Sequence, residues 1–173
     1  PSYISSNYNV TQMCEEIGWS SDFGQFAGKG LFHPDHKLHL HQYEAFTQVL
    51  KQKKNVVVTS GTGSGKTESF LLPLIASILE ESKKWNASEK VSDINVWDTS
   101  NKWHSKREGE KRTAAVRGLI LYPLNALVED QLVRLRKALD SNSVRDWLKE
   151  NREGNQIYFG RYTGKTPVAG HPN

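Results

Sequence analysis

The 173-residue sequence has little sulfur and no long apolar run, and each shortage excludes a class of protein. Its single cysteine, Cys14, cannot form a disulfide within the chain, which is typical of a protein of the reducing cytoplasm. No stretch approaches the roughly 20 consecutive apolar residues of a membrane-spanning helix. Residues 1–19 lack the basic start and apolar core of a signal peptide. We therefore predict a cytoplasmic protein with no membrane partner.

The composition indicates one globular domain with a mild positive charge. Apolar residues make up 36% of the chain and charged residues 24%, as in ordinary globular proteins. A chain of 173 residues is long enough for one domain with a proper core and short for two. The net charge of +4 permits a polyanionic partner without requiring one.

Apolar residues at helical spacing, or a capping pattern, predict five helices. They are expected at residues 11–17, 41–53, 66–81, 124–140 and 144–149. Ser143 and Asp146 resemble a capping box for the last helix, and Pro73 is expected to kink the third. The glycine- and aromatic-rich stretch at 18–34 is predicted to be a loop.

Three short apolar segments predict strands. They lie at 55–59, 118–122 and 156–160, and the first is expected to be buried. Because strands alternate with helices, we predict an α/β fold with a parallel sheet flanked by helices. Ligands bind at the carboxyl ends of the strands in such sheets. The loops SGTGSGKT, YPLN and RYTGKTP follow the three strands and are expected along that edge.

Residues 82–117 are polar, charged and without clear periodicity, so we predict an insertion on the surface. The insertion contains Trp85, Trp97 and Trp103 among lysines and arginines. Such tryptophans can stack on single-stranded bases, or they can anchor a loop onto its domain. We favour the anchoring role.

The loop at residues 60–67, SGTGSGKT, is the strongest chemical signal in the chain. Gly61, Gly63 and Gly65 allow the backbone to curl, so that successive N–H groups point at phosphate oxygens. The helix that follows directs its positive N-terminus at the same anion. The loop therefore predicts a phosphate-binding P-loop.

Two side chains of this loop carry the chemistry. Lys66 would reach the β- and γ-phosphates of a nucleotide, and Thr67 would offer its hydroxyl to Mg²⁺. Ser60 stands where the P-loop pattern has glycine, a small residue that we expect to be tolerated. The segment FGRYTGKT at 159–166 also ends in Gly-Lys-Thr, but Pro167 follows and no helix is predicted there. We predict no second nucleotide site.

With its neighbours, the P-loop resembles the superfamily 2 DEAD/DEAH-box helicases, specifically their N-terminal RecA-like ATP-binding domain. LHLHQYEAF resembles the glutamine motif, TSGTGSGKTESFLLP resembles motif I, LYPLNALVEDQ resembles motif Ia and YTGKTP resembles motif Ib. The resemblance covers roughly residues 20–167. It implies an N-terminal extension and adenine-side loop at 1–40, followed by the first part of the RecA-like domain at 41–173, an incomplete one.

The resemblance also implies roles for individual residues. Gln42 would read the adenine edge through its amide, and Phe32, with Phe26 as the other candidate, would stack on the base. The residues implied to bind ATP are Gln42, Phe32, Ser60, Gly61, Thr62, Gly63, Ser64, Gly65, Lys66, Thr67 and Glu68. Lys66 and Thr67 are the catalytic ones, and Thr67 is the Mg²⁺ ligand.

The residues implied to contact nucleic acid follow the second and third strands. They are Pro123, Asn125, Gln131, Thr163 and Gly164. Hydroxyls, backbone N–H groups and helix N-termini grip phosphates without reading sequence. The basic run at 134–137 is more typical of a solvated helix face. The histidine-rich segment at 33–41 matches no standard zinc pattern, and we predict no metal there.

The resemblance implies an ATP-dependent helicase or translocase that couples ATP hydrolysis to movement on nucleic acid, on DNA rather than RNA. Catalysis in the family needs an Asp-Glu pair on a later strand and a second RecA-like domain with an arginine finger. No such pair follows the third strand before Asn173, so this chain alone is expected to be inactive. The alternatives are a translocase of a restriction or phage-defence system that does not unwind, a regulatory ATP-binding module without turnover, and a P-loop kinase or GTPase.

Overall fold

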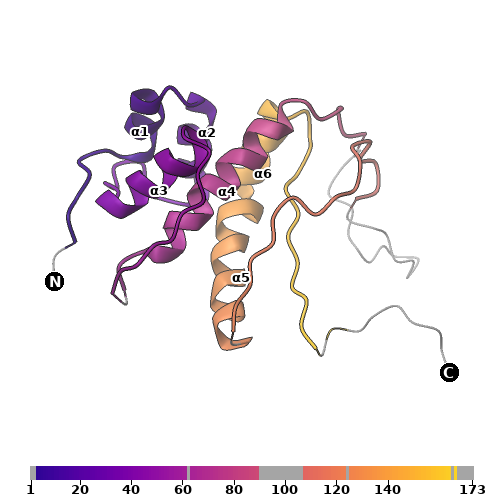
Figure 1. The fold of residues 1–173 in the computed structure, drawn as a ribbon. Coiled ribbons are helices and arrows are strands. Elements are labelled where there is room, and N and C mark those ends of the chain that lie inside the picture. Colours follow the sequence, from indigo (N-terminus) through magenta and orange to yellow (C-terminus); the bar gives the residue numbers. More distant parts are fainter. Residues whose placement is uncertain (1–2, 62, 90–106, 124, 165, 167–173) are drawn as a thin grey trace.

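The computed structural model describes residues 3–61, 63–89, 107–123, 125–164 and 166. Six helices occupy these residues (Figure 1): α1 Val10–Ile17, α2 Ser21–Gly30, α3 Leu40–Leu50, α4 Lys66–Ser82, α5 Asn125–Asp140 and α6 Asn142–Asn151. In the part of the chain that is described, no helix is both long and apolar enough to cross a membrane.

Helix α1 begins and ends with specific caps. The side chain of Asn9 accepts from the N–H of Gln12, whose own side chain accepts from the N–H of Asn9. Gly18 ends the helix in the left-handed conformation, at φ 70°. These contacts satisfy backbone groups that the first and last turns leave unpaired. Helix α1 then packs against α2.

Helix α2 occupies the stretch that the glycine content predicted to be a loop, and that prediction was wrong. Phe23, Phe26 and Ala27 are buried on one face of the helix, and their burial outweighs the low helix propensity of the glycines. Gly24 lies so close to α1 that an added Cβ would come within 2.9 Å of the Cα of Thr11. The glycine that lowers helix propensity therefore allows the two helices to approach.

The core lies among the six helices, all of which contribute buried residues; α3 packs against α4, α1 against α2, and α2 against α5 and α6. Phe46 of α3 stacks on Phe23 of α2 with ring centroids 5.6 Å apart. Phe26 meets Trp147 of α6 edge-on at 5.4 Å. Helix α4 continues past the buried Pro73 to Ser82, so the proline does not end it.

Helix α6 begins earlier than predicted. Its N-cap is Ser141, not Ser143. The hydroxyl of Ser143 instead donates to the carbonyl of Lys29 at the end of α2, across 2.8 Å. The predicted capping box was wrong because a tertiary contact takes the hydroxyl that would have capped the helix.

In the part of the chain that the structure describes, none of the three predicted segments forms a strand of a sheet. Among the described residues, strand-type pairing is limited to an isolated bridge between Ser5 and His39. The first segment was expected to be buried, yet Val57 is 90% exposed, and Leu119 and Leu121 of the second segment are 76% and 81% exposed. The expected burial of the first segment was therefore wrong. An apolar pattern specifies an extended conformation locally, whereas a sheet requires a neighbouring backbone.

The two ends of the insertion lie close together. The N–H of Glu89 donates to the carbonyl of Gly109 across 2.8 Å. Trp85 packs against the core, and the guanidiniums of Arg112 and Arg117 lie 3.7 and 5.0 Å from its ring centroid. The predicted anchoring role is confirmed for Trp85. Trp97 and Trp103 lie outside the described residues.

Candidate nucleotide and nucleic-acid site

The phosphate loop runs from an extended segment directly into α4. Gly63 and Gly65 adopt φ 74° and 75°, in the left-handed region that favours glycine. Gly65 is the N-cap of α4, and no side chain caps this helix. The N–H groups of the first turn are therefore not taken by a capping side chain, and the helix N-terminus suits an anion. Thr62, predicted to belong to this loop, lies outside the described residues.

Two sets of hydrogen bonds hold the loop together. The ammonium of Lys66 donates to the carbonyl oxygens of Ser60 and Gly61, at 2.6 and 2.5 Å. The hydroxyls of Ser60 and Ser64 lie 2.6 Å apart. Ser60, where the P-loop pattern has glycine, thus fastens one side of the loop to the other. The loop backbone and the Lys66 ammonium form a donor set that fits the phosphates of a nucleotide.

Gln42 links α3 to the phosphate loop. Its amide oxygen accepts from the backbone N–H of His39 at 2.9 Å, and its amide nitrogen donates to the carbonyl of Gly65 at 3.0 Å. The side chain is buried, with 2% of the residue exposed. The residue predicted to read adenine is therefore in contact with the phosphate loop.

The two aromatic residues predicted for the base differ in their surroundings, and the stacking role stays a prediction. Phe26 is fully buried in the core. Phe32 stacks on His36, with ring centroids 5.2 Å apart, and packs against the core. The phosphate loop has a different aromatic neighbour: the hydroxyl of Tyr3 lies 3.1 Å from the position of a Cβ on Gly61.

Tyr3 belongs to a small aromatic cluster beside the loop. Its ring lies 5.5 Å from that of His39 and 6.2 Å from that of His41, and the two imidazoles stack at 5.6 Å. No local sequence pattern predicts this cluster, because Tyr3 lies far from the loop along the chain. It is brought there by hydrogen bonds between the backbones of residues 4–6 and 38–40.

Thr67 and Glu68 lie in the first turn of α4, with Thr67 half-buried. Glu68 forms an ion pair with Arg134 of α5, the atoms Oε1 and Nη1 being 2.7 Å apart. Its second oxygen, Oε2, is buried and has no hydrogen-bond partner among the described residues. Sequence reasoning missed the Arg134 contact, since the basic run at 134–137 was interpreted as a solvated face.

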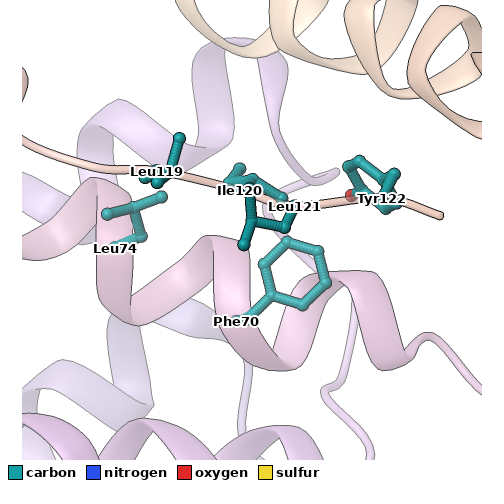
Figure 2. Close-up of a pocket in the computed structure, with 6 residues that line it drawn as sticks. All are labelled: Phe70, Leu74, Leu119, Ile120, Leu121 and Tyr122. Atoms are coloured by element: carbon teal, nitrogen blue, oxygen red, sulfur yellow. The ribbon is translucent and has the colours of Figure 1, made fainter.

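The second extended segment lies along α4 and forms an open apolar groove with it, of about 370 Å³. Figure 2 shows its lining residues: Phe70, Leu74, Leu119, Ile120, Leu121 and Tyr122. Gly118 permits this approach, because an added Cβ would lie 2.7 Å from Leu74 Cδ1. The groove brings Tyr122 and the loop after it toward the end of α4 where the phosphate loop lies.

The residues predicted to contact nucleic acid differ in exposure. Pro123 and Gly164 are exposed, and Thr163 is half-buried, with its N–H bound to the hydroxyl of Thr166 at 2.8 Å. Asn125 is the first residue of α5. Gln131 is only 8% exposed and donates to Asp130. These roles stay predictions.

A glycine-rich loop that curls into a helix N-terminus and carries a lysine is the arrangement found in P-loop nucleotide-binding domains. The chain belongs to the DEAD/DEAH box helicase family, whose model matches residues 39–159. Members of this family bind ATP, usually with Mg²⁺. Their domain has a RecA-like α/β fold, so the predicted class is that of the family, while the described residues show its helices and no paired sheet.

Curated relatives support the assignment. Over 144 residues the chain is 34% identical to the Druantia protein DruE of Escherichia coli strain UMEA 4076-1, covering 83% of this chain and 6% of that protein. It is 29% identical to the ATP-dependent RNA helicase DBP9 of Eremothecium gossypii over 62% of this chain and 14% of that protein. The chain thus spans a small part of each relative. No solved structure matches it significantly.

Proposed function

We propose that this chain is the ATP-binding part of an ATP-dependent DNA helicase or translocase that couples ATP hydrolysis to movement on nucleic acid. The observation that carries the proposal is the match of the helicase family to residues 39–159, which contain the P-loop and the buried Gln42 in contact with it. The protein would act in the cytoplasm, together with a second RecA-like domain.

In this proposal the N–H groups of the loop and the ammonium of Lys66 bind the β- and γ-phosphates, and the hydroxyl of Thr67 binds Mg²⁺. ATP supplies the phosphoryl group whose transfer to water releases the free energy for movement. On binding ATP, Gln42 would exchange its bonds to His39 and Gly65 for bonds to the base. It would then distinguish adenine from guanine, because its amide can accept from the exocyclic amine and donate to N7, whereas guanine has an acceptor in place of that amine.

Nucleic acid would lie along the loops that follow the second and third extended segments. Exposed Pro123 and Gly164, with the first turn of α5, would contact phosphates without reading sequence. The Tyr-Pro-Leu-Asn form of the second loop supports DNA as the substrate. RNA is the competing substrate, since the DBP9 relative is an RNA helicase.

A second candidate is a translocase that does not unwind, of the kind found in restriction or phage-defence systems. The match to the Druantia protein DruE covers 83% of the chain and the match to the RNA helicase DBP9 covers 62%, which favours a protein other than a compact RNA helicase. A strand-displacement assay and a triplex-displacement assay separate the two, because a translocase removes a triplex-forming strand without opening the duplex.

The first test is a titration of Mg·ATP and Mg·GTP against the full-length protein and against Gln42→Ala and Lys66→Ala. We expect a preference for ATP, loss of that preference with Gln42→Ala and loss of binding to both nucleotides with Lys66→Ala. Gln52→Ala, at an exposed glutamine just beyond α3, is the matched control and should bind as the unaltered protein does. Equal affinity for GTP, or no effect of Gln42→Ala, would favour the kinase or GTPase class.

The nucleic-acid half of the proposal needs a separate measurement. ATP hydrolysis by the full-length protein should rise on addition of single-stranded DNA, and less on addition of RNA of the same sequence. Hydrolysis that neither polymer changes would favour the regulatory module without turnover or another P-loop class.

A further inference from the structure

We propose that the ion pair between Glu68 and Arg134 couples the phosphate loop to the nucleic-acid face of α5, so that binding at one site changes the affinity at the other. Arg134 is then a positioning residue, acting through Glu68 and not on ATP itself. The inference rests on the proposed function, because it assigns a role within a protein that binds both ATP and nucleic acid.

Glu68 joins the loop to α5, through its backbone on one side and its carboxylate on the other. Its backbone N–H donates to the carbonyl of Gly65, which fixes it in the first turn of α4. Its Oε2 faces the loop, 3.2 Å from where a Cβ on Gly65 would sit, while Oε1 accepts from Arg134 at 2.7 Å. A displacement of the loop at Gly65 is therefore passed to the carboxylate that holds Arg134.

Arg134 extends this link along α5. Its Nε lies 3.3 Å from the carboxylate of Asp130, one turn earlier on the helix, so the guanidinium bridges two acids. The side chain of Glu68 is only 17% exposed, which shields its end of the pair from water. An ion pair with a buried end is weakened less by salt than one on the open surface.

Two ion pairs join α5 to other parts of the chain near its middle, Glu129 with Arg161 and Arg134 with Glu68, and of these the second leads to the phosphate loop. The C-terminal half of the helix meets α2, where the carbonyl of Lys137 would lie 2.1 Å from a Cβ on Gly30, and Ala138 and Leu139 are buried in the core. The N-terminal half begins at Asn125, in the turn that is proposed to contact nucleic acid. Arg134 thus lies between the part of the helix that the core fixes and the part that is proposed to bind nucleic acid.

The phenol of Tyr122 lies beside the Glu68–Arg134 ion pair and supports the same inference. The hydroxyl of Tyr122 is buried and has no hydrogen-bond partner among the described residues, and its charged neighbours are Arg134, Asp130 and Glu68. With Glu68 Oε2, it gives this junction two buried polar atoms without a partner. A junction with unsatisfied polar atoms can adopt a second hydrogen-bonding arrangement when the loop or the helix moves, as a two-state link requires.

The test measures the coupling between the two ligands in the full-length protein. The affinity for a fluorescent ATP analogue is determined with and without a saturating single-stranded oligonucleotide, and the ratio of the two is the coupling factor. Coupling factors between sites commonly lie between about 5 and 150. We expect Arg134→Ala to bring this factor to within about twofold of one, and Arg134→Lys, which keeps the positive charge, to restore most of it.

Two further variants make the result specific. Arg136→Ala removes the same charge from an exposed position of the same helix and should leave the coupling factor unchanged. Adding Glu68→Gln to Arg134→Ala should cause no further loss, because residues that act as one unit are not additive. Circular dichroism checks that each variant is folded. We expect the Arg134 variants to fold, because the Arg134 side chain is half-exposed.

The outcomes separate this inference from the proposed function. If the unaltered protein shows coupling and Arg134→Ala retains it, the inference is overturned and the proposed function stands. If Arg136→Ala abolishes coupling as fully as Arg134→Ala does, general charge loss is the cause and the inference is again overturned. If the unaltered protein shows no coupling and no binding of the oligonucleotide, both the proposed function and the inference fail.

Discussion

The amide nitrogen of Gln42 lies 3.0 Å from the carbonyl oxygen of Gly65, and this hydrogen bond joins α3 to the phosphate loop. Gly65 allows the contact in two ways. Its φ of 75° is strained for any other residue, and a Cβ there would come within 2.4 Å of the Gln42 amide nitrogen. The position therefore requires glycine for both conformation and space.

Gly65→Ala should accordingly weaken ATP binding. The left-handed backbone costs a non-glycine residue roughly 1–2 kcal/mol, and a loss of about 1.4 kcal/mol is tenfold in affinity. We expect at least a tenfold higher dissociation constant for Mg·ATP by fluorescence titration. Gly160→Ala is the control, since nothing lies within 4 Å of its Cβ position. An unchanged affinity for Gly65→Ala would show that the loop is bound in another conformation.

Arg112 should be among the residues on which stability depends most. It is buried, pairs with Glu110 at 2.7 Å, stacks on Trp85 and donates to the carbonyl of Gln156. Removing one partner of a buried pair costs about 3–5 kcal/mol. Arg112→Ala should therefore lower the free energy of unfolding by about 3 kcal/mol, as measured by urea denaturation.

Arg117 provides the matched comparison for Arg112. It also stacks on Trp85, but its partner Glu81 is 45% exposed. Burial opposes the charged form of Glu81, yet hydrogen bonds from Trp85 and Arg117 outweigh it and lower the pKa of this carboxyl. Because exposed pairs contribute little, Arg117→Ala should cost at most about 1 kcal/mol. Equal losses for the two arginines would mean that stacking on Trp85, and not the buried ion pair, provides the stabilisation.

Cys14 should be unreactive in the folded protein. Burial raises the pKa of its thiol from 9.0 to about 12, and the nearby Glu15 adds to the increase. The thiolate is the reactive form, so at pH 8 a disulfide reagent should react with the folded protein at least about 100-fold more slowly than with the unfolded protein. Comparable rates in the two states would contradict the burial of α1.

The same thiol gives stability a pH dependence of known sign. Below pH 9.0 the thiol is protonated in both the folded and the unfolded chain, so it does not change how the free energy of unfolding varies with pH. Above that pH the unfolded chain loses the proton first, so ionisation favours unfolding and stability falls as pH rises toward about 12. Cys14→Ala should remove this part of the alkaline loss, which urea denaturation at pH 8 and pH 10 would detect.

Gly30→Ala should destabilise the chain although alanine is the better helix former. At an exposed helical position the exchange gains up to about 1 kcal/mol. Here a Cβ would lie 2.1 Å from the carbonyl oxygen of Lys137, so α2 and α5 must move apart. Overpacking of this kind costs about 1–3 kcal/mol. We expect a lower melting temperature by calorimetry, and an increase would contradict the close approach of the two helices.

The helices were predictable where the apolar spacing is regular. The pattern in α3, α4 and α5 places their buried residues on one face, and each begins within one residue of the prediction. Helix α2 escaped prediction because its glycines lower helix propensity while Phe23 and Phe26 contribute burial that depends on tertiary packing. Local propensity therefore failed where the stabilising contacts are distant.

The candidate site was predictable only where its residues form a local sequence motif. Gln42 and the phosphate loop are recognisable because each is a short local motif with a known chemical use. The ion pair of Glu68 with Arg134 joins residues 66 positions apart, so no local sequence pattern predicts it. The pairing of the extended segments is equally non-local, since an apolar run specifies a conformation but not its neighbour.

The hydrogen bonds of Lys66 have a consequence for which ligands the loop accepts. Its ammonium is bound by the carbonyl dipoles of Ser60 and Gly61, so an arriving ligand must compete with the protein's own backbone. A carbonyl carries only a partial charge, and a polyphosphate readily displaces it. A nucleoside has no charge for this exchange, and a monophosphate lacks the β- and γ-phosphates that a P-loop lysine reaches. We therefore expect Lys66 to favour longer phosphate chains, so that affinity should rise steeply from AMP to ADP to ATP although all three have the same base.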